Sequence, residues 1–203
     1  MCEVGSRLWQ KGLISGNEGN ITVRLDADTV LATPAGISKG HLLPEDLVLI
    51  NMEGVSKDGG SPSSEIRIHL EAYKQRADCV AVVHAHPPTA IAFTLVGETI
   101  PDDVLPEAAY VLGRVPTVEF GMPGTSELSD KLSPYLAGHK TFLLTHHGAV
   151  TLGKSVFDAC YRMECLESVC RVLFAARQLG RVRPMPADAY ERFGPMAQDG
   201  AFR

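Results

Sequence analysis

The sequence predicts an α/β protein of the α+β type, with a mixed, largely antiparallel central sheet flanked by helices. Short apolar runs of strand type are interspersed with longer segments whose apolar residues recur at helical spacing. Several of the strand-type runs are separated only by short turns, which favours antiparallel pairing over a doubly wound parallel sheet. With 203 residues and no internal repeat, the chain is expected to form one domain over residues 1–203, with 181–203 as a C-terminal arm.

The first part of the chain is expected to hold a short helix and three strands. Val4 and Leu8 lie at helical spacing, and a turn rich in glycine and asparagine follows them. The next apolar runs are separated by turn residues, as in neighbouring antiparallel strands. The expected elements are a helix within residues 1–14, a turn at 15–20 and strands at 21–24, 29–33 and 46–51.

In the middle of the chain a helix is expected to open at Ser63-Ser64-Glu65, with one of the two serines as its N-cap. A long amphipathic helix closed by Gly180 is expected as the last large element. Between them the sequence predicts strands at 81–86, 115–120 and 141–144, helices at 89–95 and 126–137, and the long helix at 158–179.

The net charge of −5 is spread along the chain, so no nucleic-acid or membrane surface is expected. The five cysteines are odd in number, and their spacing matches no zinc-binding or redox motif. No signal peptide or apolar span is recognisable. A cytoplasmic protein is therefore expected.

Three histidines are the main candidates for a metal site. His84 and His86 end an apolar run, and residues i and i+2 of a strand share a face, so both imidazoles are expected at one site. His147 follows another strand-type run, and Gly148 permits close backbone approach, whereas His146 is expected on the opposite face. Three nitrogen donors with one exchangeable position are typical of a catalytic zinc site. The alternative is a pair of strand-end histidines hydrogen-bonded to their neighbours; surface or packing roles are expected for His41, His69 and His139.

Several small and polar residues in turns are suited to binding an anion such as phosphate, through backbone and side-chain donors. They are Gly19, Asn20, Gly36, Ser63 and Ser64. Each has a simpler alternative: the serines as helix caps, and the adjacent Glu65 as an acid favoured in a first helical turn. No P-loop or dinucleotide motif is present, so nucleotide binding is not indicated.

These motifs together resemble the class II aldolase/adducin superfamily, and within it the L-fuculose-phosphate aldolase type. The resemblance extends over roughly residues 8–180, nearly the whole chain. Its specificity comes from the order in which the matching segments occur, at residues 19–24, 33–36, 62–65, 82–86, 120–128 and 146–148.

The resemblance implies a three-layer fold and a homotetramer with active sites between subunits. It also implies one zinc ion per subunit, held by His84, His86 and His147. Glu65 matches the family glutamate that reaches the metal in the resting enzyme and acts as acid/base in turnover. The implied phosphate-binding positions are Gly19, Asn20, Ala35, Gly36, Ser63 and Ser64.

The implied reaction is the reversible cleavage of a ketose 1-phosphate, similar to fuculose 1-phosphate. The products are dihydroxyacetone phosphate and a short aldehyde such as lactaldehyde. Zinc would stabilise the enediolate formed when the carbon–carbon bond breaks, and Glu65 would protonate it.

The sequence departs from the aldolase pattern at several positions. Leu105 stands where the family has a tyrosine that handles the aldehyde oxygen, and Ala35 lacks a hydroxyl often found in the phosphate turn. Asn17 replaces a threonine. Glu107 and Tyr110 are candidates to replace the missing tyrosine, or are ordinary surface and packing residues.

Other reactions on the same site stay open, namely those of a decarboxylase, a dehydratase or a 4-epimerase. Ala109 stands where the epimerase has an aspartate, which counts against that reaction. A non-catalytic, adducin-like assembly module is disfavoured because all three histidines are present.

Overall fold

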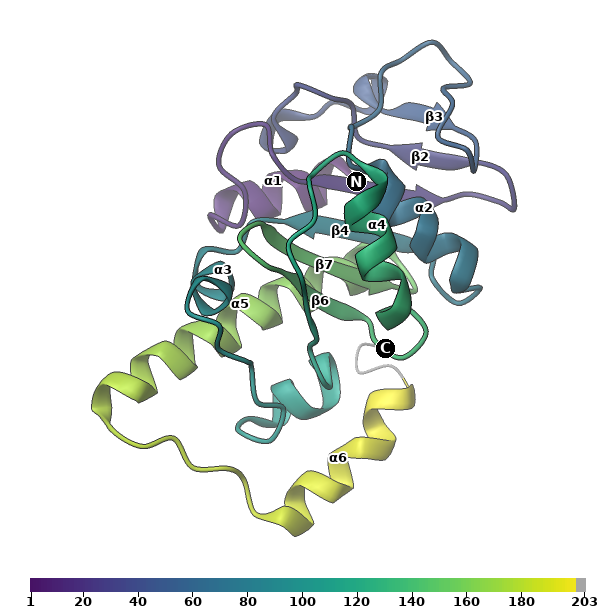
Figure 1. Cartoon of the computed structure of the whole chain (residues 1–203). Helices are drawn as coiled ribbons and strands as arrows, with labels where there is room; N and C mark the ends of the chain where they lie inside the picture. Colours follow the sequence, from purple (N-terminus) through teal and green to yellow (C-terminus); the bar gives the residue numbers. More distant parts are fainter. Residues whose placement is uncertain (200–203) are drawn as a thin grey trace.

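A computed structural model describes residues 1–199, with side chains described up to residue 193. Seven strands form one sheet in the order β3-β2-β1-β4-β7-β6-β5 (Figure 1). Strands β5 and β6 run parallel, and every other neighbouring pair of the described sheet runs antiparallel, which confirms the predicted mixed sheet. The strands are β1 (Asn20–Arg24), β2 (Val30–Ala32), β3 (Val48–Ile50), β4 (Ala81–Ala85), β5 (Thr117–Val118), β6 (Thr141–Leu144) and β7 (Gly148–Gly153).

Helices cover both faces of the sheet (Figure 1). They are α1 (Cys2–Gln10), α2 (Ile66–Gln75), α3 (Pro88–Leu95), α4 (Ser126–Leu132), α5 (Val156–Leu179) and α6 (Ala187–Asp199), with short turns η1 (Lys39–His41), η2 (Pro44–Asp46), η3 (Ala108–Leu112) and η4 (Ser133–Tyr135). One core cluster joins α1, α3 and α5 to the sheet, and a second joins α2 and α4 to its other face. Since side chains alternate along β4, Val83 lies in the first cluster and Val82 in the second.

Strand β7 was not predicted from the sequence, although it lies in the sheet between β4 and β6. All six of its residues are buried, because helices cover the sheet on both sides. A strand buried on both faces lacks the polar and apolar alternation that reveals a strand.

Several predicted boundaries were wrong. Helix α2 begins only at Ile66, with Glu65 in the cap position, and neither Ser63 nor Ser64 caps it. The helix predicted at 126–137 ends as α4 at Leu132 and continues as η4, which contains Pro134, a residue that cannot continue the α-helical hydrogen bonds. The strand predicted at 115–120 is shortened to Thr117–Val118.

The chain after α5 runs back along the molecule and forms α6 beside η3 (Figure 1). The rings of Tyr110 and Phe193 lie 5.9 Å apart, and Tyr190 Oη donates to Asp102 Oδ2 at 2.8 Å. The segment predicted as an arm therefore contacts the loop and turn between α3 and β5.

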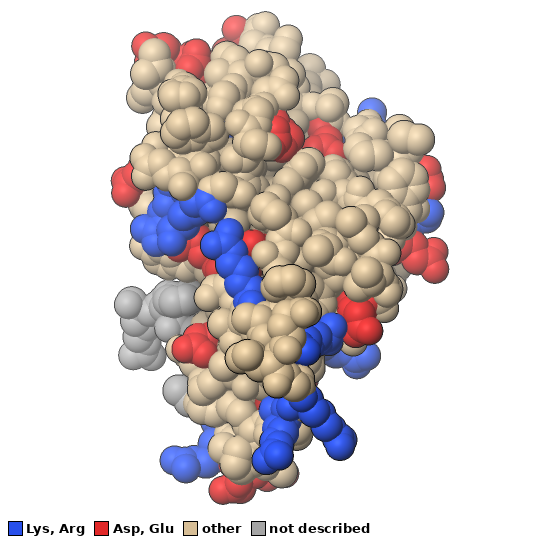
Figure 2. Space-filling view, turned by 90° about the vertical axis from the view of Figure 1, so that its left-hand side faces the viewer, with Lys and Arg blue, Asp and Glu red and all other residues tan. Residues whose placement is uncertain are grey.

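Charged side chains are scattered over the face of the molecule shown in Figure 2, among a larger uncharged surface. Basic side chains gather toward the lower end of that view, and acidic ones lie among them. None of the described helices combines the length and the apolar composition needed to cross a bilayer.

A buried polar group links α2 to β1. His69 is fully buried, with Nδ1 2.8 Å from Thr22 Oγ1, which in turn lies 2.7 Å from Tyr73 Oη. Burial, reinforced by the charge of His84, lowers the pKa of His69 from 6.5 to about 3. The folded protein thus keeps this imidazole neutral at pH values where the unfolded chain protonates it.

This difference predicts a pH-dependent stability. As the pH falls below 6.5 the unfolded state binds a proton that the folded state excludes until about pH 3, so stability is complete above that interval and is lost within it. One such proton changes the free energy of unfolding by up to about 1.4 kcal/mol per pH unit. His69→Gln is expected to show a shallower slope between pH 6.5 and about 5, measured by urea unfolding. The exposed His41→Gln is the control, and equal slopes in the two variants and the parent would contradict the assignment.

Candidate metal centre

His84, His86 and His147 form one cluster, in which the ligand nitrogens all lie within 4.8 Å of one another. His84 is on β4 and His86 directly follows it, so the alternation of the strand points both rings to the same side. Ring centroids in the cluster are 4.8 to 5.0 Å apart. The histidines that the sequence suggested as ligands are therefore brought together.

A tight turn between β6 and β7 places His147 in the cluster. The His147 N–H donates to the Leu144 carbonyl at 3.1 Å. His146 has a positive φ of 56°, a backbone conformation that residues other than glycine rarely adopt. A Cβ on Gly148 would lie 2.5 Å from the Ala85 carbonyl oxygen and 2.8 Å from His86 Cδ2. The close approach of the turn to β4 therefore requires glycine at this position, as the sequence suggested.

His86 is anchored on both sides. Its backbone N–H donates to the Leu13 carbonyl at 2.8 Å, and after Pro87 the chain enters α3. Glu167 on α5, only 2% exposed, accepts hydrogen bonds from the Thr89 and Ala90 N–H groups at 3.0 and 3.1 Å. A buried carboxylate at the start of α3 thus fixes the segment that carries His86.

The arrangement of the rings suits a divalent cation. His84 Nδ1 donates to the Ala149 carbonyl at 3.0 Å, which in a neutral ring leaves a lone pair on Nε2. That Nε2 lies 3.2 Å from His86 Nε2 and 3.3 Å from Glu65 Oε2, and His147 Nε2 lies 3.1 Å from Glu65 Oε1. Each of these contacts joins atoms that repel unless a positive centre, a proton or a metal ion, lies between them. The donor set therefore fits a bound metal.

The protonation states agree with this chemistry. Burial, with the charges of His84 and His147, lowers the pKa of His86 to about 4, so the ring is neutral at neutral pH, as a ligand must be. Burial of Glu65 opposes its ionisation, but its close contacts with His147 and His84 outweigh it and hold the pKa of Glu65 well below its usual value.

The six positions suggested for phosphate line one pocket of about 220 Å³ together with Glu65. Its lining residues are Asn17, Glu18, Gly19, Asn20, Ala35, Gly36, Lys39, Ser63, Ser64 and Glu65. A bridge between Pro34 and Pro62 holds two of the contributing turns together. Asn20 Nδ2 donates to Glu65 Oε2 at 3.2 Å, which connects this pocket to the histidine cluster.

Lys39 is a pocket residue that the sequence did not reveal. It is 2% exposed, and its Nζ donates to the carbonyls of Asn17 at 2.6 Å and Ile37 at 2.9 Å, which leaves a third N–H. Burial lowers the pKa of Lys39, while Glu18 and Glu65 act in the opposite direction. A lysine in a turn is ordinarily solvent-exposed, so nothing in the sequence distinguished this one.

Leu105, at the position of the family tyrosine, and the two candidates to replace that tyrosine lie away from the histidines of this chain. Leu105, Glu107 and Tyr110 line a separate pocket of about 530 Å³, with Lys11 and Glu164. No histidine of the cluster lines that pocket. The chain therefore does not bring these three side chains to its own metal site.

The geometry of the site agrees with a comparison of sequences. Residues 1–174 match the family described as the class II aldolase and adducin N-terminal domain. The chain belongs to this family. Its fold is the one that the resemblance implied, and the three histidines that the resemblance gave as ligands lie together at the end of β4.

Named relatives within the class II aldolase family catalyse different reactions. A 3-oxo-tetronate 4-phosphate decarboxylase of Pectobacterium atrosepticum is 35% identical, with 86% of this chain and 82% of the relative covered. An L-fuculose phosphate aldolase of Methanococcus maripaludis is 31% identical, with 85% and 93% covered. The crystal structure of YgbL from Escherichia coli, described as an aldolase, epimerase or decarboxylase, has a TM-score of 0.88 at 30% identity, with 96% and 95% covered.

The ligand assignment is tested by comparing two adjacent histidines. His147→Ala is expected to lower metal affinity by more than about a hundredfold, because removing a ligand costs more than removing its hydrogen-bond partner. His146→Asn keeps a side chain that tolerates a positive φ and should retain stoichiometric metal. The measurement is the metal content of each variant after dialysis, by mass spectrometry. Equal metal content in the two variants would refute the assignment.

Proposed function

We propose that this chain is a metal-dependent lyase that breaks a carbon–carbon bond beside the ketone of a phosphorylated sugar. The observation that carries the proposal is the position of Glu65. Its carboxylate lies 3.1 Å from His147 Nε2 and 3.3 Å from His84 Nε2, and it also lines the pocket that contains Asn20, Ser63 and Ser64. An acid/base group thus stands between a metal site and a pocket suited to phosphate.

Zinc is the proposed metal, because three neutral nitrogen donors are typical of its catalytic sites. When bound by the three histidines, it would polarise the ketone oxygen and accept the negative charge that develops as the bond breaks. Glu65, as a carboxylate, would take a proton from water and pass it to the carbon left with the electron pair. Its burial and its two histidine neighbours keep the carboxylate oriented for this transfer.

The pocket beside Glu65 is proposed to hold the phosphate of the substrate. Lys39 supplies a positive charge and a spare N–H, and Ser63 and Ser64 supply hydroxyl groups. Gly36 has a φ of 74° and nothing within 4 Å of where its Cβ would be, so the backbone there is open to a ligand. Together these groups would fix the sugar with its ketone toward the histidines.

Of the reactions that fit, we favour decarboxylation of a 3-oxo sugar-acid phosphate. In 3-oxo-tetronate 4-phosphate, the bond between the carboxylate carbon and C2 breaks, CO2 leaves, and a proton adds to C2 to give dihydroxyacetone phosphate. Departure of CO2 requires no donor or base at the leaving group, which agrees with Leu105 at the position of the family tyrosine. The 35% identity to a decarboxylase supports the same choice.

The aldolase reaction on a ketose 1-phosphate is the second candidate. The segment Pro62-Ser63-Ser64-Glu65 resembles the L-fuculose-phosphate aldolase type, and a solved L-fuculose 1-phosphate aldolase has a TM-score of 0.88 at 26% identity. Both reactions leave an electron pair on the carbon beside the ketone and end in dihydroxyacetone phosphate. They differ only in whether CO2 or an aldehyde departs.

A product assay tests the function and separates the two reactions. Zinc-loaded protein with 3-oxo-tetronate 4-phosphate is expected to release CO2 and dihydroxyacetone phosphate, identified by mass, while His147→Ala should not. A parallel incubation contains dihydroxyacetone phosphate and lactaldehyde. Condensation in this second incubation without decarboxylation in the first would establish the aldolase, and turnover in neither would refute the proposal.

Glu65→Gln is expected to lower kcat at least about a hundredfold, because the amide cannot transfer the proton. Glu18→Gln is the matched control, since Glu18 lines the same pocket but binds Ser15 and Gly16 instead of the histidines. Its kcat should stay within about tenfold of the parent. Steady-state kinetics of both zinc-loaded variants measure the effect, and a Glu65→Gln enzyme as fast as the control would exclude the acid/base role.

A further inference from the structure

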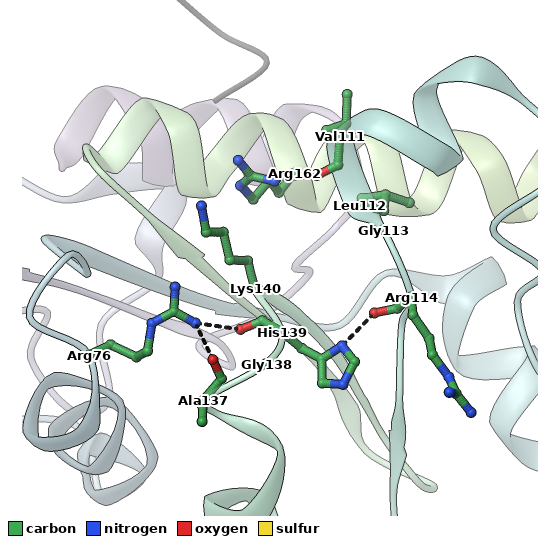
Figure 3. Close-up of a pocket in the computed structure, with 10 residues that line it drawn as sticks. All are labelled: Arg76, Val111, Leu112, Gly113, Arg114, Ala137, Gly138, His139, Lys140 and Arg162. Atoms are coloured by element: carbon green, nitrogen blue, oxygen red, sulfur yellow. Dashed lines mark hydrogen bonds between the residues drawn. The ribbon is translucent and has the colours of Figure 1, made fainter. Parts of the chain in front are cut away.

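A further pocket, of about 290 Å³, lies at the ends of the strands away from the metal centre. Figure 3 shows the residues that line it. Four of its lining side chains are cationic: Arg76, Arg114, Lys140 and Arg162. The other lining residues are Val111, Leu112, Gly113, Ala137, Gly138 and His139, so no carboxylate lines the pocket. We call the pocket lined by these ten residues the cationic pocket.

The charges around the cationic pocket do not balance. Arg76 binds Asp78 through Nε and Nη2, at 2.8 Å each, and Arg162 Nη2 lies 3.2 Å from Asp158 Oδ1. Lys140 and Arg114 have no ion pair among the described residues. Two positive charges therefore remain uncompensated, that of Lys140 inside the pocket and that of the exposed Arg114, whose side chain extends away from Lys140 and Arg162 (Figure 3).

Arg162 contributes a buried guanidinium to the pocket wall. It is 2% exposed, donates a hydrogen bond to the Val111 carbonyl, and keeps its Nε without any hydrogen-bond partner. Burying a guanidinium is costly unless its charge and its donors are matched. A single carboxylate, Asp158, leaves that requirement only partly met.

Lys140 points toward Arg162 across the pocket (Figure 3). Burial and the charge of Arg162 lower the pKa of Lys140, and Arg76 and Lys154 act in the same direction against Asp78. Arg76 donates to the carbonyls of Leu136 at 2.9 Å and His139 at 3.2 Å. These hydrogen bonds fix the residues that precede Lys140 in the sequence. Two cations are thus held facing one another by a rigid frame.

The cationic pocket is separate from the metal centre. Arg76 precedes β4 and Lys140 precedes β6, whereas His84 lies near the other end of β4, and His86 and His147 follow the other ends of β4 and β6. Strands of four and five residues, at about 3.3 Å per residue, separate the two sites by roughly 15 Å.

We propose that the cationic pocket is a binding site for a doubly charged oxyanion, namely a phosphate group. Lys140 inside the pocket, Arg114 at its rim and the unpartnered guanidinium N–H of Arg162 call for an anionic ligand with several acceptor oxygens. An adjoining hollow of about 730 Å³ shares Arg114 and His139 with the pocket and offers space for the organic part of a phosphate ester. Inorganic phosphate and a phosphate monoester both meet these requirements, and the experiment distinguishes between them.

The test is binding of inorganic phosphate and of glycerol 3-phosphate to the full chain by calorimetry, at constant ionic strength with chloride as the other anion. Lys140→Met is expected to weaken binding at this site at least about tenfold, because a charged hydrogen bond and a full charge are removed. Lys154→Met is the matched control, since it removes an equal charge from an exposed residue outside the pocket. Lys39→Met, which alters only the pocket beside Glu65, should leave this binding intact.

Thermal unfolding checks that the variants are folded. Phosphate should raise the Tm of the parent and of Lys154→Met, and should raise the Tm of Lys140→Met by a smaller amount. Nitrate at the same ionic strength should not bind, because it carries a single charge. The proposal is overturned if Lys140→Met binds phosphate and the ester as tightly as Lys154→Met, or if neither anion binds to the parent outside the pocket beside Glu65.

Discussion

The register of β4 between its two neighbours determines the geometry of the metal centre. His84 lies opposite Asn20 of β1 on one side and Val150 of β7 on the other. A slip of one residue would turn His84 and His86 into the core beneath α5 and move the apolar side chains that belong there to the face of the metal centre. The burial of Val82 and Val83 on opposite faces therefore specifies the position of the imidazoles as well as the stability of the sheet.

Much of the site could be predicted from local patterns. The alternation of a strand placed His84 and His86 on one side, and Gly148 indicated a close approach that the structure shows beside the Ala85 carbonyl. The grouping of the turns that contain Asn20, Ala35 and Ser63 followed from a family resemblance, since residues so far apart in sequence give no local signal of contact. Their meeting is a property of the sheet order.

Other features had no local signal. Strand β7 is buried on both faces and begins and ends in glycine, so its sequence lacks the alternation that reveals a strand. Lys39 is a buried cation whose environment is created by the chain around Asn17 and by η1, and the cationic pocket is assembled from four separate parts of the chain. Burial of charge depends on what the tertiary fold places nearby, which periodicity and composition do not encode.

The hydrogen bonds from the start of α3 to Glu167 make the metal centre depend on α5. A nascent chain would have released all three histidines and Glu65 from the ribosome before Glu167 emerged, some twenty residues after His147. Until then the segment after His86 lacks its carboxylate anchor, and the cluster lacks the rigidity that favours a metal over solvent. Capture of the metal should accordingly be a late event in the life of the newly made polypeptide.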